Sequence, residues 1–82
     1  MSTKIVDTIT SGQCRAARGL IEMTQTELAA LANLGLSTIV DFEKARRDVS
    51  REAKESIRKA LEKAGVQFIA KNGGGPGVRL QR

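Results

Sequence analysis

The chain lacks the residue types on which most enzyme and metal sites depend. Its 82 residues include no histidine, tryptophan or tyrosine, and only one cysteine and two phenylalanines. Histidine is a frequent general acid or base and the commonest metal ligand, and a lone cysteine cannot form an internal disulfide. No pair of carboxylates stands out as a catalytic pair either. We therefore expect a protein that is not an enzyme and that needs no metal and no cofactor.

Long apolar runs are also missing. A membrane-spanning helix needs roughly 20 consecutive apolar residues, and no segment approaches that length. The N-terminal stretch, MSTKIVDTIT, lacks the apolar block of a signal peptide. These absences predict a cytoplasmic protein with no membrane partner. The 14 Lys and Arg against 9 Asp and Glu give a net charge of +5, which favours a polyanionic partner without identifying it.

The most informative segment is 24–43, which predicts two short helices joined by a tight turn. Thr24 can cap the first helix while the side chain of Glu27 reaches back to the backbone of Thr24. Apolar residues share one face over 25–32 and again over 36–44, and Asn33 in the turn between them tolerates a left-handed backbone. Helices this short cannot bury their apolar faces alone. The segment therefore predicts a helix-turn-helix packed on flanking helices, with DNA as the leading partner.

The flanking segments supply further helices. One is expected to begin after Thr10, whose side chain pairs with Gln13 in the same capping arrangement. A long helix is expected between Ser50 and Gly65, with a solvated charged outer face. The buried stripe of the first helix is expected at Cys14, Ala17, Leu20 and Ile21. Cys14 is accordingly interpreted as a small core residue rather than a redox switch, because no activating base is nearby in sequence.

After Gly65 the pattern changes from helical to alternating. Segments 66–69 and 78–80 are typical of two short strands joined by a glycine-rich loop. Such a loop cradles phosphate only where a helix follows it, so nucleotide binding is disfavoured here. A two-stranded hairpin is barely stable alone, and its unpaired edge can pair with another chain. We therefore predict a homodimer whose interface includes Val66, Phe68, Val78 and Leu80.

Together these patterns predict a mainly α fold, a compact helical bundle with a central helix-turn-helix and a short C-terminal β-hairpin. Residues 1–8 are expected to form an N-terminal arm, 9–65 a DNA-binding domain and 66–82 the hairpin that dimerises.

Several residues within 9–65 match a known family position by position. Gln25 occupies the position at the start of the first motif helix where the family has a glutamine, and Ala29 occupies the position where the two motif helices pack closely. Arg18 and Glu43 match a partly buried ion pair that braces the motif. The apolar positions match at Leu28, Ala32, Leu34, Ile39 and Phe42. The chain thus resembles the phage-repressor-like (Cro and Xre type) helix-turn-helix regulators. It departs from them where Asn33 and Ala45 replace glycines and where Gly35 replaces a serine or threonine.

The resemblance implies double-stranded DNA as the partner of a transcriptional regulator, a repressor acting as a homodimer on a palindromic operator. The DNA-binding residues that it implies are Gln25, Leu36, Ser37, Thr38, Asp41, Lys44, Arg46 and Arg47. Leu36, Ser37 and Asp41 are expected to face the groove, where an acid can accept from a cytosine amino group. Thr38 is expected near the phosphate rim. Gln25 is expected to brace the DNA backbone and contact Ser37. The basic residues after the second motif helix are expected to clamp phosphates.

An alternative function uses the same fold differently. An antitoxin or anti-regulator would act mainly through a protein partner, which the hairpin could recruit. The chain is nearly all consumed by the DNA-binding fold and the hairpin, which favours the DNA-binding function, but both stay open at this point.

Overall fold

A helical bundle followed by one hairpin makes up the computed structural model, which describes residues 9–70 and 73–81. Its helices are α1 (Ser11–Ile21), α2 (Gln25–Ala32), α3 (Leu36–Glu43) and α4 (Arg51–Lys63), and its strands are β1 (Val66–Ile69) and β2 (Gly77–Leu80). The predicted mainly α fold with a C-terminal β-hairpin is confirmed. The arm predicted over 1–8 lies outside the described residues.

Side-chain caps define the helix starts that the sequence predicts. Thr10 Oγ1 accepts from the amide of Gln13 at 3.0 Å, and Gln13 Oε1 accepts from the amide of Thr10 at 2.9 Å. Thr24 and Glu27 form the same reciprocal pair at the start of α2, and Ser50 caps α4. These bonds satisfy amides that have no partner within their own helix, so each helix begins at a fixed residue.

The turn between α2 and α3 keeps the expected geometry without the family's glycine. Asn33 ends α2 in the left-handed region, with φ of 59°. Gly35 precedes α3 in an extended conformation and offers no side chain to cap it. Asparagine is the residue after glycine that best tolerates a left-handed backbone, which explains why the turn is preserved.

Ala45, just after α3, also has a left-handed backbone, with φ of 54°. This conformation costs a residue with a Cβ about 1–2 kcal/mol, whereas glycine loses roughly 0.5–1 kcal/mol in extra chain entropy. We expect Ala45→Gly to raise the free energy of unfolding by about 0.5–1 kcal/mol in urea denaturation. The control, Ala16→Gly within α1, should lower it by a similar amount. A loss of stability in both variants would contradict backbone strain at Ala45.

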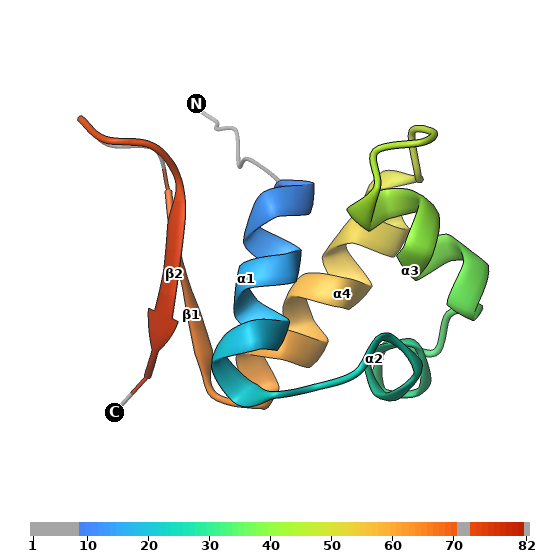
Figure 1. Cartoon of the computed structure of the whole chain (residues 1–82), viewed down its shortest axis with the longest axis horizontal. Coiled ribbons are helices and arrows are strands. Elements are labelled where there is room, and N and C mark those ends of the chain that lie inside the picture. Colours follow the sequence, from blue (N-terminus) through green and yellow to red (C-terminus); the bar gives the residue numbers. More distant parts are fainter. Residues whose placement is uncertain (1–8, 71–72, 82) are drawn as a thin grey trace.

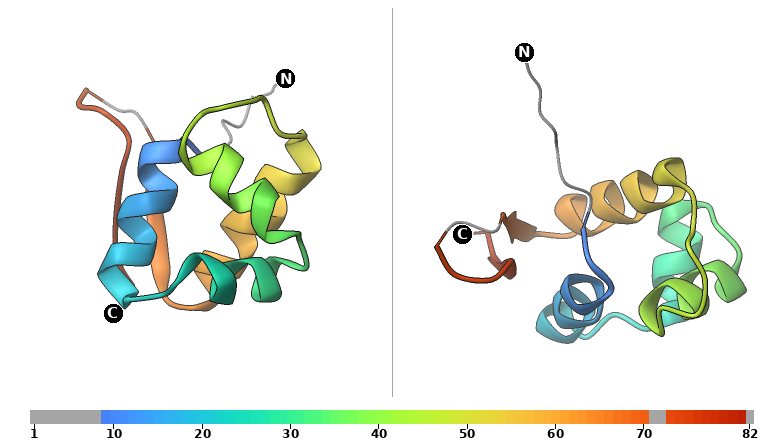
Figure 2. Two further views of the ribbon diagram at one scale, coloured as in Figure 1. Left: turned by 45° about the vertical axis from the view of Figure 1, so that its right-hand side comes forward. Right: turned by 90° about the horizontal axis from the view of Figure 1, so that it is seen from above.

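The hairpin lies at one end of the molecule and α3 at the other, with α1 and α4 between them (Figure 1). Two further views show the same order (Figure 2). The strands pair antiparallel, with Val66 opposite Leu80 and Phe68 opposite Val78. The hairpin therefore covers α1 on the side away from α3.

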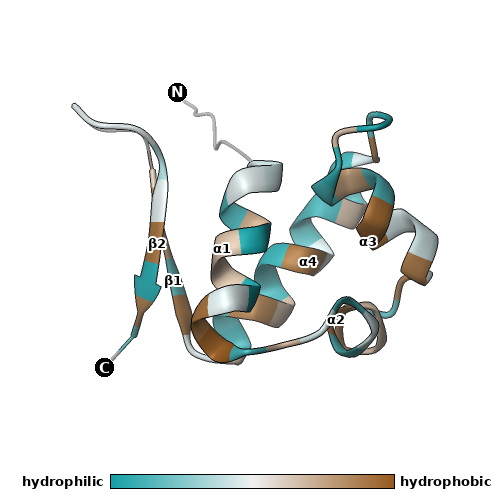
Figure 3. Cartoon of the chain, in the orientation of Figure 1, coloured by the Kyte–Doolittle hydropathy of each residue, from teal (hydrophilic) through white to brown (hydrophobic). Residues whose placement is uncertain are grey.

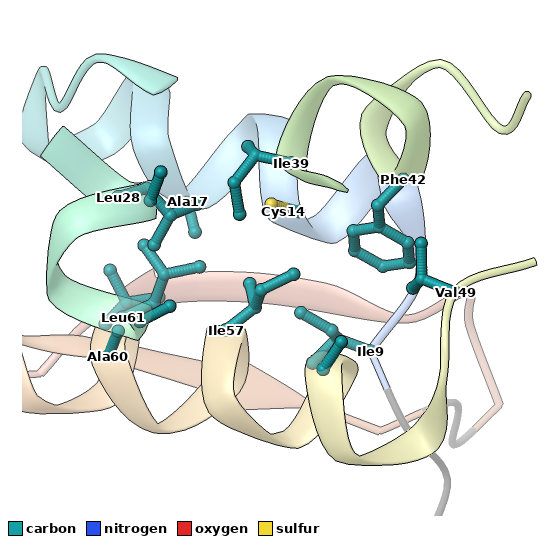
Figure 4. Packing of buried hydrophobic residues seen from close by; sticks show 14 residues of the cluster. Ile9, Cys14, Ala17, Leu28, Ile39, Phe42, Val49, Ile57, Ala60 and Leu61 are labelled. Atoms are coloured by element: carbon teal, nitrogen blue, oxygen red, sulfur yellow. The ribbon is translucent and has the colours of Figure 1, made fainter. Parts of the chain in front are cut away.

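The core draws side chains from all four helices and from β1. Leu28, Ile39, Ile57 and Leu61 are fully buried, and they converge between α4 and the helices above it (Figure 4). Ile9 and Val49, outside the helices, close one end of this core. The sequence predicts an inner face for the long helix at Ala53, Ile57, Ala60, Leu61 and Ala64. The first four are buried, whereas Ala64 at the end of the helix is exposed.

Two expectations about apolar residues are wrong. Leu20, predicted in the buried stripe of α1, is 42% exposed. Val66, predicted at a dimer interface, is 0% exposed because it lies in the chain's own core. Opposite residues in an antiparallel pair share one face of the sheet, so Phe68, Val78 and Leu80 turn toward the helices with Val66. Phe68 and Val78 pack against the core, and only Leu80 stays substantially exposed, at 42%.

Gln13 holds the hairpin in this position, a role that the sequence did not reveal. Its side-chain amide donates to the carbonyl oxygens of Ile69, at 3.3 Å, and Gly77, at 3.0 Å. The same side chain completes the cap of α1. One buried residue therefore joins the first turn of α1 to the loop end of the hairpin.

Candidate nucleic-acid interface

Helix α3 has one buried face and one exposed face. Ile39 and Phe42 anchor the buried face in the core, at 0% and 6% exposure. On the other side, Leu36 is 46% exposed, Ser37 is exposed and Thr38 is half-buried. The start of α3 thus presents an apolar side chain next to two hydroxyls, a combination suited to contact with base edges.

The end of α3 is anchored by a buried carboxylate. The side chain of Glu43 is 2% exposed and pairs with Arg18 of α1. Arg18 donates to it twice, from Nε at 2.7 Å and from Nη2 at 2.6 Å, and its Nη1 also donates to the Met23 carbonyl at 3.0 Å. Such a bidentate pair fixes the relative orientation of its two elements. The ion pair expected between these residues is present.

Two further side chains complete the environment of the Glu43 carboxylate. Gln25 Nε2 donates to Oε1 at 3.0 Å, and Cys14 Sγ donates to Oε2 at 3.1 Å. Gln25, expected to brace the DNA backbone and contact Ser37, thus links the start of α2 to the end of α3. The contact of Cys14 with Glu43 was not predicted, because nothing in the sequence connects positions so far apart.

These contacts determine the protonation states in the cluster. Burial alone would raise the pKa of Glu43, but the hydrogen bonds from Arg18, Cys14 and Gln25 outweigh burial and hold the pKa below its usual range. Hydrogen bonding to Glu43 raises the pKa of Arg18. Burial first, and then the adjacent carboxylate, strongly raise the pKa of the Cys14 thiol. Cys14 therefore stays a protonated core residue, as expected, and is not a nucleophile.

Arg15 adds a backbone contact to the same end of α3. Its Nη1 donates to the carbonyl oxygen of Glu43, whose own helix leaves that oxygen without a partner. Three residues of α1, Cys14, Arg15 and Arg18, thus hold the end of α3. The exposed face of α3 is therefore presented on a rigid support.

A basic segment follows α3. Lys44, Arg46 and Arg47 are exposed, and Lys44 forms no ion pair within 9–70 and 73–81. Three exposed cations in one short link, residues 44–47, can contact successive phosphates.

Asp41 lies in an ion pair within the chain. Its Oδ2 accepts from Arg47 Nε at 2.8 Å, and its Oδ1 lies 4.0 Å from Arg46 Nη1. The carboxylate predicted to accept from a cytosine amino group is, in this structure, an ion-pair partner of Arg47. Asp41 therefore restrains the two arginines and reduces the positive charge of the link.

Neither a metal site nor a membrane span is found in the described part of the chain. Within 9–70 and 73–81, no three potential His, Cys, Asp or Glu ligands cluster, and no helix there is long and apolar enough to cross a bilayer. Searches against protein-family models and curated proteins yield no match.

Proposed function

We propose that the protein is a sequence-specific double-stranded DNA-binding transcriptional regulator of the Cro and Xre type, a repressor that acts as a homodimer on a palindromic operator. The observation that supports this most is α3 itself. Its inner face is anchored in the core, its outer face exposes Leu36 and Ser37, and a basic segment follows it directly.

The contacts that hold α3 in place are important for recognition of a DNA sequence. A side chain discriminates bases only when its donor or acceptor is held in register with the base edge. The cluster of Glu43 with Arg18 and Gln25 fixes the end of α3 to both preceding helices. A helix held in this way enters the major groove without a large loss of conformational entropy.

The positive charges of the link after α3 supply the part of the affinity that does not depend on the DNA sequence. Phosphate contacts dominate non-specific binding and place a protein on the duplex. Asp41 holds Arg47 in one orientation, so part of this clamp is arranged before DNA binds. A dimer with two such sites about 34 Å apart would contact successive turns of one DNA face, and bound over a promoter it would exclude the polymerase.

The alternative of a protein-directed antitoxin or anti-regulator is favoured by one residue. Leu31, on the outer side of α2, is 60% exposed and has no evident part in reading DNA. A protein partner could cover it. Such a protein would bind its own upstream DNA no better than unrelated DNA.

Sequence preference provides the test. We expect tighter binding to the DNA upstream of the protein's own gene than to scrambled DNA of equal length, measured by fluorescence anisotropy. In a randomised-site selection, Ser37→Ala should lose about 1–3 kcal/mol of discrimination at one position per half-site, because it removes one polar base contact.

Ser56→Ala, the matched control, deletes the same hydroxyl from α4 and should keep the wild-type preference. No preference for any DNA in the wild-type protein would contradict the proposed function. An unchanged preference in Ser37→Ala would show that α3 is not the reading helix.

A further inference from the structure

Two leucines remain exposed where α1 meets the hairpin. Leu20 near the end of α1 and Leu80 at the end of β2 are each 42% exposed. Apolar residues are visible at these ends of both elements (Figure 3). Scattered apolar residues on a surface are normal, so their significance depends on whether the two leucines are adjacent.

The geometry of α1 and β2 places Leu20 and Leu80 at the same height along the two elements. Gln13 bonds to the Gly77 carbonyl at 3.0 Å, and from this point α1 and β2 run in the same direction (Figure 1). The seven residues from Gln13 to Leu20 advance a helix by about 10 Å and nearly two full turns, so Leu20 lies on the hairpin side. The three residues from Gly77 to Leu80 advance a strand by about 10 Å as well.

Beside these leucines, no other strand of the described residues pairs with the outer edge of β2. The described sheet has two strands only, β1 and β2. The amide of Gln81 donates inward to the Gly65 carbonyl at 2.7 Å. Since amides alternate in direction along an antiparallel strand, those of Val78 and Leu80 point away from β1. An apolar pair thus adjoins a row of backbone donors and acceptors that no strand within 9–70 and 73–81 occupies.

We propose that this edge binds β2 of a second copy, antiparallel, with Leu20 and Leu80 of both chains at the centre. The proposal rests on the homodimer of the proposed function and identifies its contact surface. A two-fold axis at Leu80 places the two Leu80 side chains together and sets each Arg79 opposite a Gln81, so like charges do not face each other. A strand pairing with its own copy in this way is self-complementary, as a symmetric dimer requires.

The size of the surface indicates how strong this dimer is. Stable interfaces bury about 800 Å² per partner, and two partly exposed leucines with a four-residue strand supply less. The free protein should therefore dimerise with a Kd in the micromolar range or weaker, on the order of 10 µM or above. DNA binding would tighten assembly, because two linked half-sites raise the effective concentration of the second subunit.

The test compares variants of exposed leucines in the free protein, without DNA. In sedimentation velocity between about 5 and 500 µM, wild type should shift from monomer to dimer. Leu20→Ser with Leu80→Ser should raise the dimer Kd at least tenfold. Leu31→Ser, the control on α2, removes a more exposed leucine and should leave the Kd unchanged.

Amide exchange checks the strand pairing separately. The Val78 and Leu80 amides should exchange more slowly as wild-type concentration rises, while the rates in the double variant stay constant. Dimerisation of the double variant at the wild-type Kd, or a wild type that stays monomeric throughout, would overturn the proposal. A failure of DNA binding would leave these outcomes unaffected, because no DNA is present.

Discussion

Glu43→Ala should lower the free energy of unfolding by about 3–5 kcal/mol, the usual effect of removing one partner of a buried ion pair. The carboxylate is 2% exposed and accepts hydrogen bonds from Arg18, Gln25 and Cys14. Alanine leaves all three donors without that acceptor, and the Arg18 guanidinium, 20% exposed, loses its counter-charge. Urea denaturation monitored by circular dichroism measures the change.

A surface carboxylate provides the control for this variant. Glu62 pairs with Arg58 at 3.1 Å but is 41% exposed, and exposed pairs contribute about 0–1 kcal/mol. Glu62→Gln should therefore change stability little. A loss below about 1 kcal/mol in Glu43→Ala would show that the cluster does not hold α3.

Acid should weaken the protein through the same residue. Because the pKa of Glu43 is lower in the folded chain, its stabilising contribution is fully present above the unfolded value of about 4.3. That contribution is lost as the pH falls through this value toward the folded pKa. Arg58 also lowers the pKa of Glu55, so Glu55 contributes in the same direction, and the difference between wild type and Glu43→Gln isolates Glu43. Between pH 6 and 3, Glu43→Gln should lose less stability than wild type.

Salt should weaken DNA binding by about a thousandfold between 50 and 200 mM if Lys44, Arg46 and Arg47 of both subunits contact phosphates. Six contacts give a log-log slope near −5. In Lys44→Gln with Arg46→Gln the slope should fall to about −2, so the same salt change costs only about tenfold. Arg47 is retained because its pairing with Asp41 at 2.8 Å would otherwise be lost.

The control for charge is a double variant on another surface. Lys59→Gln with Lys63→Gln removes the same net charge from the exposed side of α4. If phosphates are held by the link after α3, this variant should keep a slope near −5. Equal slopes in the two double variants would mean that net charge, and not the link, governs binding.

Local sequence signals predicted most of the fold because they act over a few residues. The caps at Thr10, Thr24 and Ser50 and the apolar spacing of α4 depend on neighbours three or four positions apart. The left-handed turn at Asn33 is also a local choice of backbone. The chain positions of the helices followed from these signals.

Contacts across the fold could not be predicted from local signals. The bonds of Cys14 and Arg15 to Glu43 join positions almost 30 residues apart, with separations of 29 and 28. Helical periodicity placed Leu20 on an apolar face of α1, but whether the hairpin covers that face depends on where Gln13 docks it. The pairing of Asp41 with Arg47 likewise depends on the path of the link after Ala45.

The double use of Gln13 makes the hairpin and α1 cooperative. Its Oε1 caps the first turn of α1, and its Nε2 holds the carbonyls of Ile69 and Gly77. A rotamer that releases the hairpin therefore also removes one half of the α1 capping pair, and fraying at the start of α1 displaces the side chain that holds the hairpin. Cys14, Arg15 and Arg18, which hold Glu43 at the end of α3, follow Gln13 on the same helix. A displacement of the hairpin is therefore transmitted to the end of α3 through one short segment of α1. We therefore expect the hairpin and the support of α3 to lose their order together.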